Sequence, residues 1–334
     1  MSDTHSDTLI VTYEDRTSAV QGVEVLARSL LVHSPQMKIK VYSPLESLRD
    51  LAVTLPNLEF IYTDKLIGRG WNVKPTVLMW ALEDNVKSVI WLDTDIVISG
   101  DIGNLCKKVK IGSIAVGQEF SSKSHIGGKI RAEGWNLKIG RLIPYHVNSG
   151  SVQVDISHKG LIAHWNRLLD SAEYQSYQHT PGPRPPAFTG DQDALWALLV
   201  SEDFSTVPVH YFKVGSDMLI HCGARGFQIK DRMRNIIYSR PTFVHMLGKY
   251  KPWSFNTIPS KSTDPNAYRH AVCFELSPFH KACEVISQSM NHPDWMLRRT
   301  KTAKFWNAFF IGNVALRGLP MALISALASF KKLF

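Results

Sequence analysis

Asp93 and Asp95 stand one residue apart at the end of an apolar run, in the segment VIWLDTDIVISGDI that begins at Val89. Residues 89–92 have the composition of a strand that is buried on both faces. A carboxylate at the mouth of such a strand loses hydration, so it needs a cation or a hydrogen-bond donor as its partner. The pair therefore has three interpretations: a cap on the next turn, a phosphohydrolase site, or a divalent cation bound together with a nucleotide diphosphate.

Phosphohydrolases of the haloacid-dehalogenase type also carry a DxD at a strand end, but on the first strand of their sheet. Here three strand-like runs, residues 8–13, 38–42 and 58–62, precede the motif. The later GDQD (190–193) could mimic the second acidic motif of that class, but it opens a helix-like run without the further carboxylate. The phosphohydrolase is therefore the weaker alternative.

Two later segments carry side chains suited to a nucleotide sugar. Asn148 and Ser149, in a small polar turn of VNSGSVQVD, could bind sugar hydroxyls, although such a turn is also common as structure alone. FVHMLGKYKPW places His245, Gly248 and Lys251 after an apolar run. An imidazole can bind Mn²⁺, a glycine lets the backbone approach a phosphate, and a lysine neutralises a leaving diphosphate. A lone histidine there is usually structural, so the combination carries the prediction.

Four motifs occur in a characteristic order: DTD at 93–95, NSG at 148–150, GDQ at 190–192 and HMLGKYKPW at 245–253. With these motifs the chain resembles the glycogenin and bacterial lipopolysaccharide galactosyltransferase family, which consists of retaining glycosyltransferases of GT-A fold that use UDP-sugars. The resemblance covers about residues 8 to 253, and the HxxGxxKPW element is its most specific part.

The resemblance implies a role for each matching residue. The metal ligands for Mn²⁺, or alternatively Mg²⁺, would be Asp93, Asp95 and His245. The catalytic residues would be Asp191, Gln192 and Lys251. The residues that contact the UDP-sugar would be Thr12, Tyr13, Lys74, Asp93, Thr94, Asp95, Asn148, Ser149, Gly248 and Lys251. Phe188 replaces an acidic residue that glycogenin-like members have before GDQ, so self-glucosylation of that kind is not expected.

Strand-like and helix-like segments alternate from residue 8 to about residue 92, with a periodic apolar stretch at 20–31 and a helix from Leu45. This alternation predicts an α/β fold with a mainly parallel, Rossmann-like central sheet flanked by helices. Ligands of such sheets bind beyond the carboxyl ends of the strands, where Asp93 and Asp95 lie. We expect a long loop or lid at 120–144, an irregular segment at 181–188, and a helix from GDQD onward.

The net charge of +9 is concentrated at the end of the chain. After Asp294 there is no acidic residue, and the seven basic ones are Arg298, Arg299, Lys301, Lys304, Arg317, Lys331 and Lys332. The rest of the chain is therefore close to neutral, and a nucleic-acid groove across it is not indicated. We predict a catalytic domain at 1–260, a connecting segment at 261–297 and a basic amphipathic tail at 298–334.

The apolar part of the tail, residues 305–330, is interrupted by Asn307, Asn313, Arg317 and Pro320. Two short helices lying in a membrane interface fit this pattern better than a transmembrane helix, with Trp306, Phe309 and Phe310 inserted in the lipid. The alternative is a terminal helix pair packed on the body of the protein. A membrane surface and a lipid-linked or glycan acceptor are therefore the predicted partners, besides the UDP-sugar donor.

The four cysteines form no CxxC pair, and the N-terminus MSDTHSDT has no features of a signal sequence. These features predict a cytoplasmic protein at the inner face of the membrane. Together with the motifs, they predict a metal-dependent retaining glycosyltransferase that transfers a hexose from a UDP-sugar to a membrane glycolipid or lipopolysaccharide-type acceptor. The alternative from another class is a non-catalytic protein of the same fold that binds a nucleotide sugar or glycan.

Overall fold

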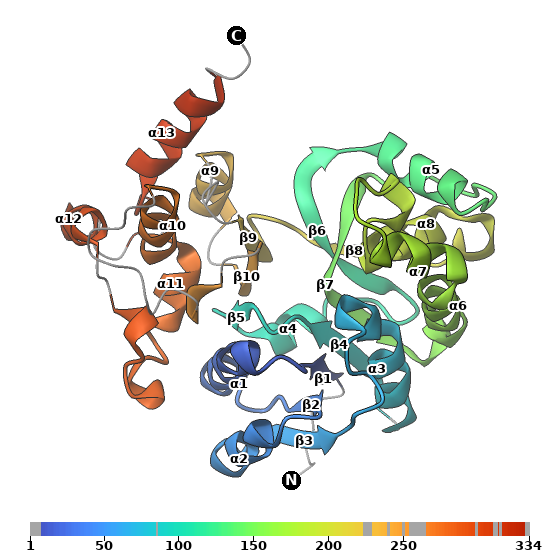
Figure 1. Cartoon of the computed structure of the whole chain (residues 1–334), viewed down its shortest axis with the longest axis horizontal. Coiled ribbons are helices and arrows are strands. Elements are labelled where there is room, and N and C mark those ends of the chain that lie inside the picture. The colour runs from blue at the N-terminus through green and yellow to red at the C-terminus, as the bar shows by residue number, and fades with distance from the viewer. Residues whose placement is uncertain are drawn as a thin grey trace. The chain divides into compact units, whose positions relative to one another are not determined.

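The computed structural model describes residues 8–84, 86–222, 229–238, 241–248, 251–253, 265–297, 300–309, 313 and 316–330. The chain divides into two compact units, each assembled from segments that are far apart in the sequence (Figure 1). Unit 1 comprises the described parts of Met1–Asp15, Gln36–Asp93 and Gly103–Val214. Unit 2 comprises the described parts of Arg16–Pro35, Thr94–Ile102 and Gly215–Phe334.

Unit 1 is built on a seven-stranded sheet with the order β3-β2-β1-β4-β7-β6-β8. All neighbouring pairs are parallel except those of β7, which runs antiparallel to β4 and β6. The predicted mainly parallel sheet is confirmed. Its strands are β1 (Thr8–Tyr13), β2 (Ile39–Ser43), β3 (Leu58–Tyr62), β4 (Ser88–Leu92), β6 (Ile114–Lys123), β7 (Tyr145–Asp155) and β8 (Val209–Phe212).

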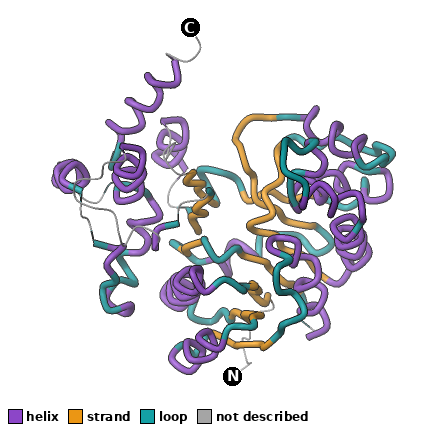
Figure 2. Tube along the Cα trace, in the orientation of Figure 1, coloured by secondary structure: helices purple, strands orange, loops and turns teal. Residues whose placement is uncertain are grey.

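Helices cover this sheet, and Figure 2 shows them beside the strands of unit 1. On one face of the sheet, α3, α6 and α8 pack against the strands in the core of unit 1, which includes Val89 and Trp91 of β4. Ile90 and Leu92 of the same strand point to the opposite face and are also fully buried. Burial on both faces explains why β4 is apolar without alternation. The helices are α2 (Glu46–Thr54), α3 (Lys74–Ala81), α4 (Ile102–Cys106), α5 (His125–Gly134), α6 (Lys159–Asp170), α7 (Ala172–His179) and α8 (Asp191–Val200).

Two sequence expectations for unit 1 are wrong. The long loop or lid predicted at 120–144 is partly regular: β6 continues to Lys123, and α5 spans His125–Gly134. Its Gly127 and Gly128 lie against Trp196, where a Cβ atom would come within 2.5 and 2.7 Å of the indole. Close glycine packing onto α8 thus stabilises a helix whose few apolar residues did not predict one. The NSG segment is no turn either, because β7 runs through it without a break.

Unit 2 contains a three-stranded sheet with the order β5-β10-β9, formed by β5 (Ile96–Ile98), β9 (Met218–Cys222) and β10 (Phe243–Leu247). Its core gathers apolar side chains of α1, β5, β9, β10 and the helices after residue 265. The described helices of this unit are α1 (Val20–His33), α9 (Ile229–Tyr238), α10 (Pro265–Glu275), α11 (Pro278–Cys283), α12 (Lys301–Phe309) and α13 (Leu319–Phe330).

The end of the chain forms the two short helices α12 and α13 that the interruptions predict, and α13 begins beside Gly318 and Pro320. Phe309 is 66% exposed, whereas Phe310 lies outside the described residues. Within the described part of the chain, no helix combines the length and the apolar character needed to cross a membrane. The predicted boundaries after residues 260 and 297 stay predictions.

Candidate functional site

Lys74 is the centre of a buried polar network in unit 1. Its ammonium lies 3.2 Å from Asp93 Oδ1 and 3.2 Å from Asp191 Oδ2, and it donates to Ser149 Oγ at 2.9 Å. The Ser149 hydroxyl in turn donates to Asp191 Oδ2 at 2.6 Å. One cation is therefore shared by two carboxylates, and the network has a net negative charge when both are ionised. Four residues predicted from the resemblance are brought together here.

The secondary structure of unit 1 explains how these side chains meet. Asp93 follows the end of β4, and Lys74 and Asp191 begin α3 and α8. The backbone N–H of Asp93 donates to the carbonyl of Gly150 on β7 at 2.8 Å, which aligns the two strands beside the network. A carboxylate such as Asp191 is stabilised at a helix N-terminus by the helix dipole, whereas a lysine is not. Lys74 therefore depends on the two carboxylates.

Burial determines the titration of this network. Burial alone lowers the pKa of Lys74, but Asp191 and Asp93 together raise it above its ordinary value. Burial also raises the pKa of Asp191, and Lys74 and Ser149 offset this only in part. Lys74 thus keeps its charge because two acidic neighbours support it, while burial makes Asp191 easier to protonate than an ordinary carboxylate.

Neighbouring side chains hold the network in place. The Trp91 indole donates to Asp93 Oδ1 at 2.7 Å, and the Trp165 indole donates to the Asp191 carbonyl at 2.9 Å. Asn148 Oδ1 accepts from the N–H of Gly150 at 2.9 Å, so this side chain orients the strand beside Ser149. Asn148 is 2% exposed, so its side chain does not lie at an open surface, and its predicted contact with a sugar stays a prediction.

Asp95 is the centre of a second cluster, in unit 2. Its Oδ1 lies 3.1 Å from His245 Nε2, and its Oδ2 accepts from Lys251 Nζ. Lys251 also donates to the carbonyl of Met246 at 2.9 Å. Burial raises the pKa of Asp95, but Lys251 and then His245 outweigh this and hold it well below the usual range. One carboxylate is therefore shared by two basic groups, the reverse of the arrangement around Lys74.

Strand pairing brings the members of this second cluster together. β5 and β10 are antiparallel with Ile96 opposite His245, and the N–H of Met246 donates to the Asp95 carbonyl at 2.9 Å. Gly248, directly after β10, has φ +104°, a conformation that side chains other than glycine rarely adopt. The glycine predicted to approach a phosphate is thus required by the backbone.

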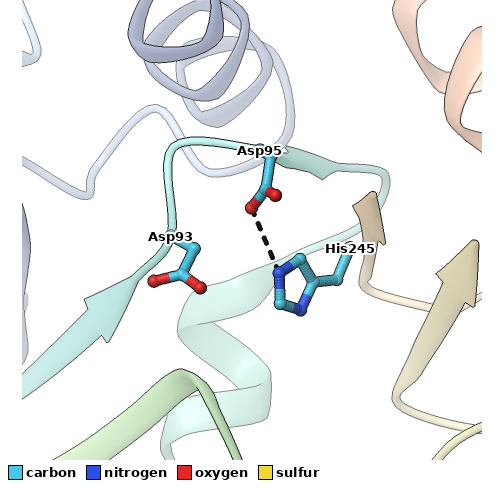
Figure 3. A group of neighbouring side chains, drawn as sticks. All are labelled: Asp93, Asp95 and His245. Atoms are coloured by element: carbon cyan, nitrogen blue, oxygen red, sulfur yellow. Dashed lines mark ion pairs between the residues drawn. The ribbon is translucent and has the colours of Figure 1, made fainter. Parts of the chain in front are cut away.

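Asp93, Asp95 and His245 each offer one ligand atom, and these atoms lie within 4.8 Å of one another. Asp93 and Asp95 are held close by the single residue Thr94 between them, and His245 points at Asp95 (Figure 3). Two carboxylates and an imidazole are ligands that Mn²⁺ and Mg²⁺ accept, with positions left for phosphate oxygens. The donor set therefore fits the predicted divalent ion.

The remaining predicted residues are buried near strand ends. Thr12 and Tyr13 end β1 and are 0% and 6% exposed, and Thr94 is 6% exposed. The Thr12 hydroxyl oxygen has no hydrogen-bond partner among the described residues. The uridine contacts of Thr12 and Tyr13 stay predictions.

Two residues that the sequence did not single out belong to these sites. Gly22 on α1 lies against the Thr94 carbonyl and the Trp253 ring, which a Cβ atom would approach to 2.4 and 2.6 Å. Glu119, on β6, accepts from Gln192 Nε2 at 3.0 Å. A carboxylate can only accept here, so the Gln192 amide must direct its oxygen elsewhere. Two weak features of the sequence could have indicated these residues. Gly22 is a glycine inside a helical pattern, and Glu119 is an acidic residue directly before the predicted lid.

No family model matches the chain, and no curated protein does. Among solved structures the chain is similar to the galactosyltransferase LgtC in complex with donor and acceptor sugar analogues, at 16% identity over 84% of this chain and 95% of LgtC, with a TM-score of 0.51. It is also similar to the bifunctional glycosyltransferase WbbM in its apo form, at 13% identity over 76% of this chain, with a TM-score of 0.47. The chain spans about half of WbbM, 48% of its length.

The similarity to LgtC shows the fold, a GT-A-like α/β architecture with a mostly parallel central sheet. The predicted fold class is thus confirmed, and so is the resemblance to lipopolysaccharide glycosyltransferases at the level of the fold. At this identity the substrates of LgtC are not carried over to this chain.

Proposed function

We propose that this chain is a metal-dependent retaining glycosyltransferase that transfers a hexose from a UDP-sugar to a lipid-linked or lipopolysaccharide-type acceptor. The observation that carries the proposal is the Asp93, Asp95 and His245 group at the end of β4, joined through Asp93 to the network around Lys74. A GT-A-like fold and this donor set together favour a nucleotide sugar over the phosphohydrolase and the non-catalytic alternatives.

The predicted carboxylate ligands each have a partner outside the ligand group. Asp93 has Lys74 and Trp91, and Asp95 has Lys251. His245 is 1% exposed and its Nε2 lies 3.1 Å from Asp95 Oδ1, so the imidazole is already held against a carboxylate of the group. Asp93, Asp95 and His245 would hold the divalent ion, which when bound supplies positive charge to the departing diphosphate.

The two lysines would have different tasks in the reaction. Lys74, which is nearly fully buried, would fix Asp93 and Asp191 and so orient the hydroxyls of the donor sugar through Asp191. Lys251 is more exposed, and its ammonium would neutralise the charge that grows on UDP as the bond to the anomeric carbon breaks.

Retention of configuration requires either a nucleophile on the β face or attack from the side of the leaving group. Gln192, the predicted residue nearest that face, carries a poorly nucleophilic amide whose Nε2 is held by Glu119. We therefore favour front-face attack, in which a UDP oxygen takes the proton of the acceptor hydroxyl.

The acceptor and the membrane surface complete the proposal. The helices α12 and α13 carry exposed apolar side chains, among them Phe305 at 55%, Phe309 at 66% and Leu327 at 66%. Lys301 and Lys304 lie on the same helix as the two phenylalanines. Exposed aromatic and basic residues together favour contact with anionic lipid at the inner face of the membrane.

The first test is UDP release from a panel of UDP-sugars by the full-length protein, with Mn²⁺, with Mg²⁺ and with EDTA. We expect slow, metal-dependent release from one donor, which would identify the sugar. Release that is equal with and without EDTA would contradict the metal, and release of inorganic phosphate from phosphomonoesters would favour the phosphohydrolase. If no donor binds in isothermal titration with Mn²⁺, the proposed function is wrong.

A further inference from the structure

Trp71 presents a half-exposed indole beside the network of unit 1. It lies in the 3₁₀ turn Gly70–Val73, three residues before Lys74, and is 52% exposed. Its Nε1 is 3.9 Å from the position of a Cβ atom on Gly190, the residue before Asp191. The Tyr174 hydroxyl, whose pKa is raised by burial and lowered in part by the neighbouring Trp71 side chain, donates to Asn72 Oδ1 at 2.8 Å. The ring therefore lies beside Tyr174 while half of its surface faces solvent.

Unit 1 also contains an open pocket of about 530 Å³, whose lining ends one residue before Gly190, the glycine that Trp71 approaches. Residues 178–182, Arg184 and Thr189 line it. Thr189 directly precedes Gly190, and Gln178 lies one helical turn after Tyr174 on α7. The chain from Thr189 to Gln192 thus runs from the pocket to the residues proposed to hold the donor sugar.

The pocket wall is held in one shape by its own hydrogen bonds. Arg184 Nη1 donates to Gln178 Oε1 at 2.7 Å and to the Thr189 carbonyl at 3.3 Å, and Nη2 donates to the Gln178 carbonyl at 3.1 Å. Gln178 Nε2 donates to the Phe188 carbonyl at 2.7 Å. A stacked pair, Tyr177 and Phe188 with ring centroids 4.8 Å apart, supports this wall.

The chemistry of this surface indicates its ligand class. The lining contains no carboxylate, so a cation is not the expected ligand, and the Arg184 guanidinium is used to hold the wall together. Its other polar side chains are Gln178, the His179 ring and two threonine hydroxyls, which donate to backbone carbonyls of their own segments and can still accept a hydrogen bond. An exposed indole next to such groups suits a ring with an apolar C–H face and hydroxyls around its edge.

We propose that Trp71 and this pocket form the acceptor subsite, in which one sugar ring of the acceptor glycan stacks on the indole and its neighbour occupies the pocket. This inference rests on the proposed function, because it assumes that the network after Gly190 holds the donor sugar. The exposed position of Trp71 leaves room for a glycan that stays attached to lipid.

The test is a titration of the full-length protein with lactose, maltose and chitobiose, followed by tryptophan fluorescence and saturation-transfer NMR. The variants are Trp71→Ala, Trp71→Phe and, as a matched surface control, Ile111→Ala, since Ile111 is 94% exposed and lies in the turn before β6. We expect at least one disaccharide to bind with millimolar affinity. Trp71→Ala should weaken it roughly tenfold, about 1.4 kcal/mol, whereas Trp71→Phe and Ile111→Ala should retain most of it.

Two outcomes would overturn the subsite: binding that Trp71→Ala leaves unchanged, or no binding of any of the three disaccharides to the wild-type protein. The donor site is tested separately by metal-dependent UDP release in the absence of acceptor. If the wild-type protein releases no UDP in the presence of metal, the proposed function is contradicted. Disaccharide binding that depends on Trp71 would still establish a glycan site in that case.

Discussion

The clusters around Lys74 and Asp95 use the same residue types in opposite proportions. In unit 1 a lysine is shared by two carboxylates, and in unit 2 a carboxylate is shared by a lysine and a histidine. The Lys74 side chain is 4% exposed and the Lys251 side chain is 22% exposed. The first cluster thus has a buried lysine and an excess of carboxylates, and the second has a more accessible lysine and an excess of basic groups.

Because of this difference, the two clusters are suited to different roles in ligand binding. A network centred on a buried, paired cation is costly to break and is suited to holding groups in fixed positions. A more exposed lysine can exchange its partner for a ligand anion at lower cost. We therefore expect mutations around Lys74 to affect folding first and mutations around Asp95 to affect chemistry first.

The largest effect is expected for Lys74→Met, which would leave the buried Asp191 and the partly buried Asp93 beside each other without a cation. The free energy of unfolding should fall by about 3–5 kcal/mol, measured by urea denaturation. Lys40→Met is the matched control, because Lys40 also lies between two carboxylates, Glu59 and Asp84, but at the surface. Equal losses for both variants would contradict the distinction between a buried and an exposed network.

Asp95→Asn should act on chemistry instead. It keeps the shape of the side chain but removes the charge that both His245 and Lys251 contact. Metal-dependent transfer should fall by at least about a hundredfold, roughly 2.7 kcal/mol in barrier, with folding monitored by circular dichroism. Asp84→Asn, at a partly exposed ion pair, is the control. A rate retained within about tenfold would refute Asp95 as a metal ligand.

Lys251→Ala should have a smaller effect that is confined to turnover. Negative charge on UDP grows in the transition state, so kcat should fall by roughly tenfold to a hundredfold with little change in donor affinity. Steady-state kinetics of the Lys251→Ala variant would measure the fall in kcat. Lys138→Ala is the control, because the Lys138 side chain is 78% exposed. A raised KM with unchanged kcat would mean that Lys251 binds the donor only in its ground state.

The smallest effect concerns the pH dependence of Ser149→Ala. The Ser149 hydroxyl lowers the pKa of Asp191, so its removal should raise that pKa further. Because the ionised form is the one proposed to hold the sugar, the acidic limb of the kcat/KM profile should move to higher pH. The loss of the hydrogen bond should also cost about 1 kcal/mol of stability.

The control for this profile is Ser151→Ala on the same strand, since Ser151 Oγ has no hydrogen-bond partner among the described residues. Its acidic limb should coincide with that of the wild type. A Ser149→Ala profile that moves to lower pH, or not at all, would show that Asp191 is not the group that titrates.

The alternation of apolar segments was sufficient to predict the parallel strands of unit 1, because each strand and helix carries its own local periodicity. The same local signals were insufficient at 120–144, where α5 depends on Gly127 and Gly128 packing against Trp196. They also misassigned the NSG segment, since the turn propensity of Asn148 and Gly150 is outweighed by pairing of β7 with strands on both sides. Contacts distant in the sequence decided both cases.

The sequence by itself determined which residues are the candidates for chemistry, since the motifs at 93–95, 148–150, 190–192 and 245–253 name the side chains and their order. Only the tertiary structure decided the partners: Lys74 with Asp93 and Asp191, Lys251 with Asp95, and Gln192 with Glu119. These partners are separated by as many as 156 positions in the chain. Strand register and helix packing set which of them meet, and neither is encoded in the local pattern around any one residue.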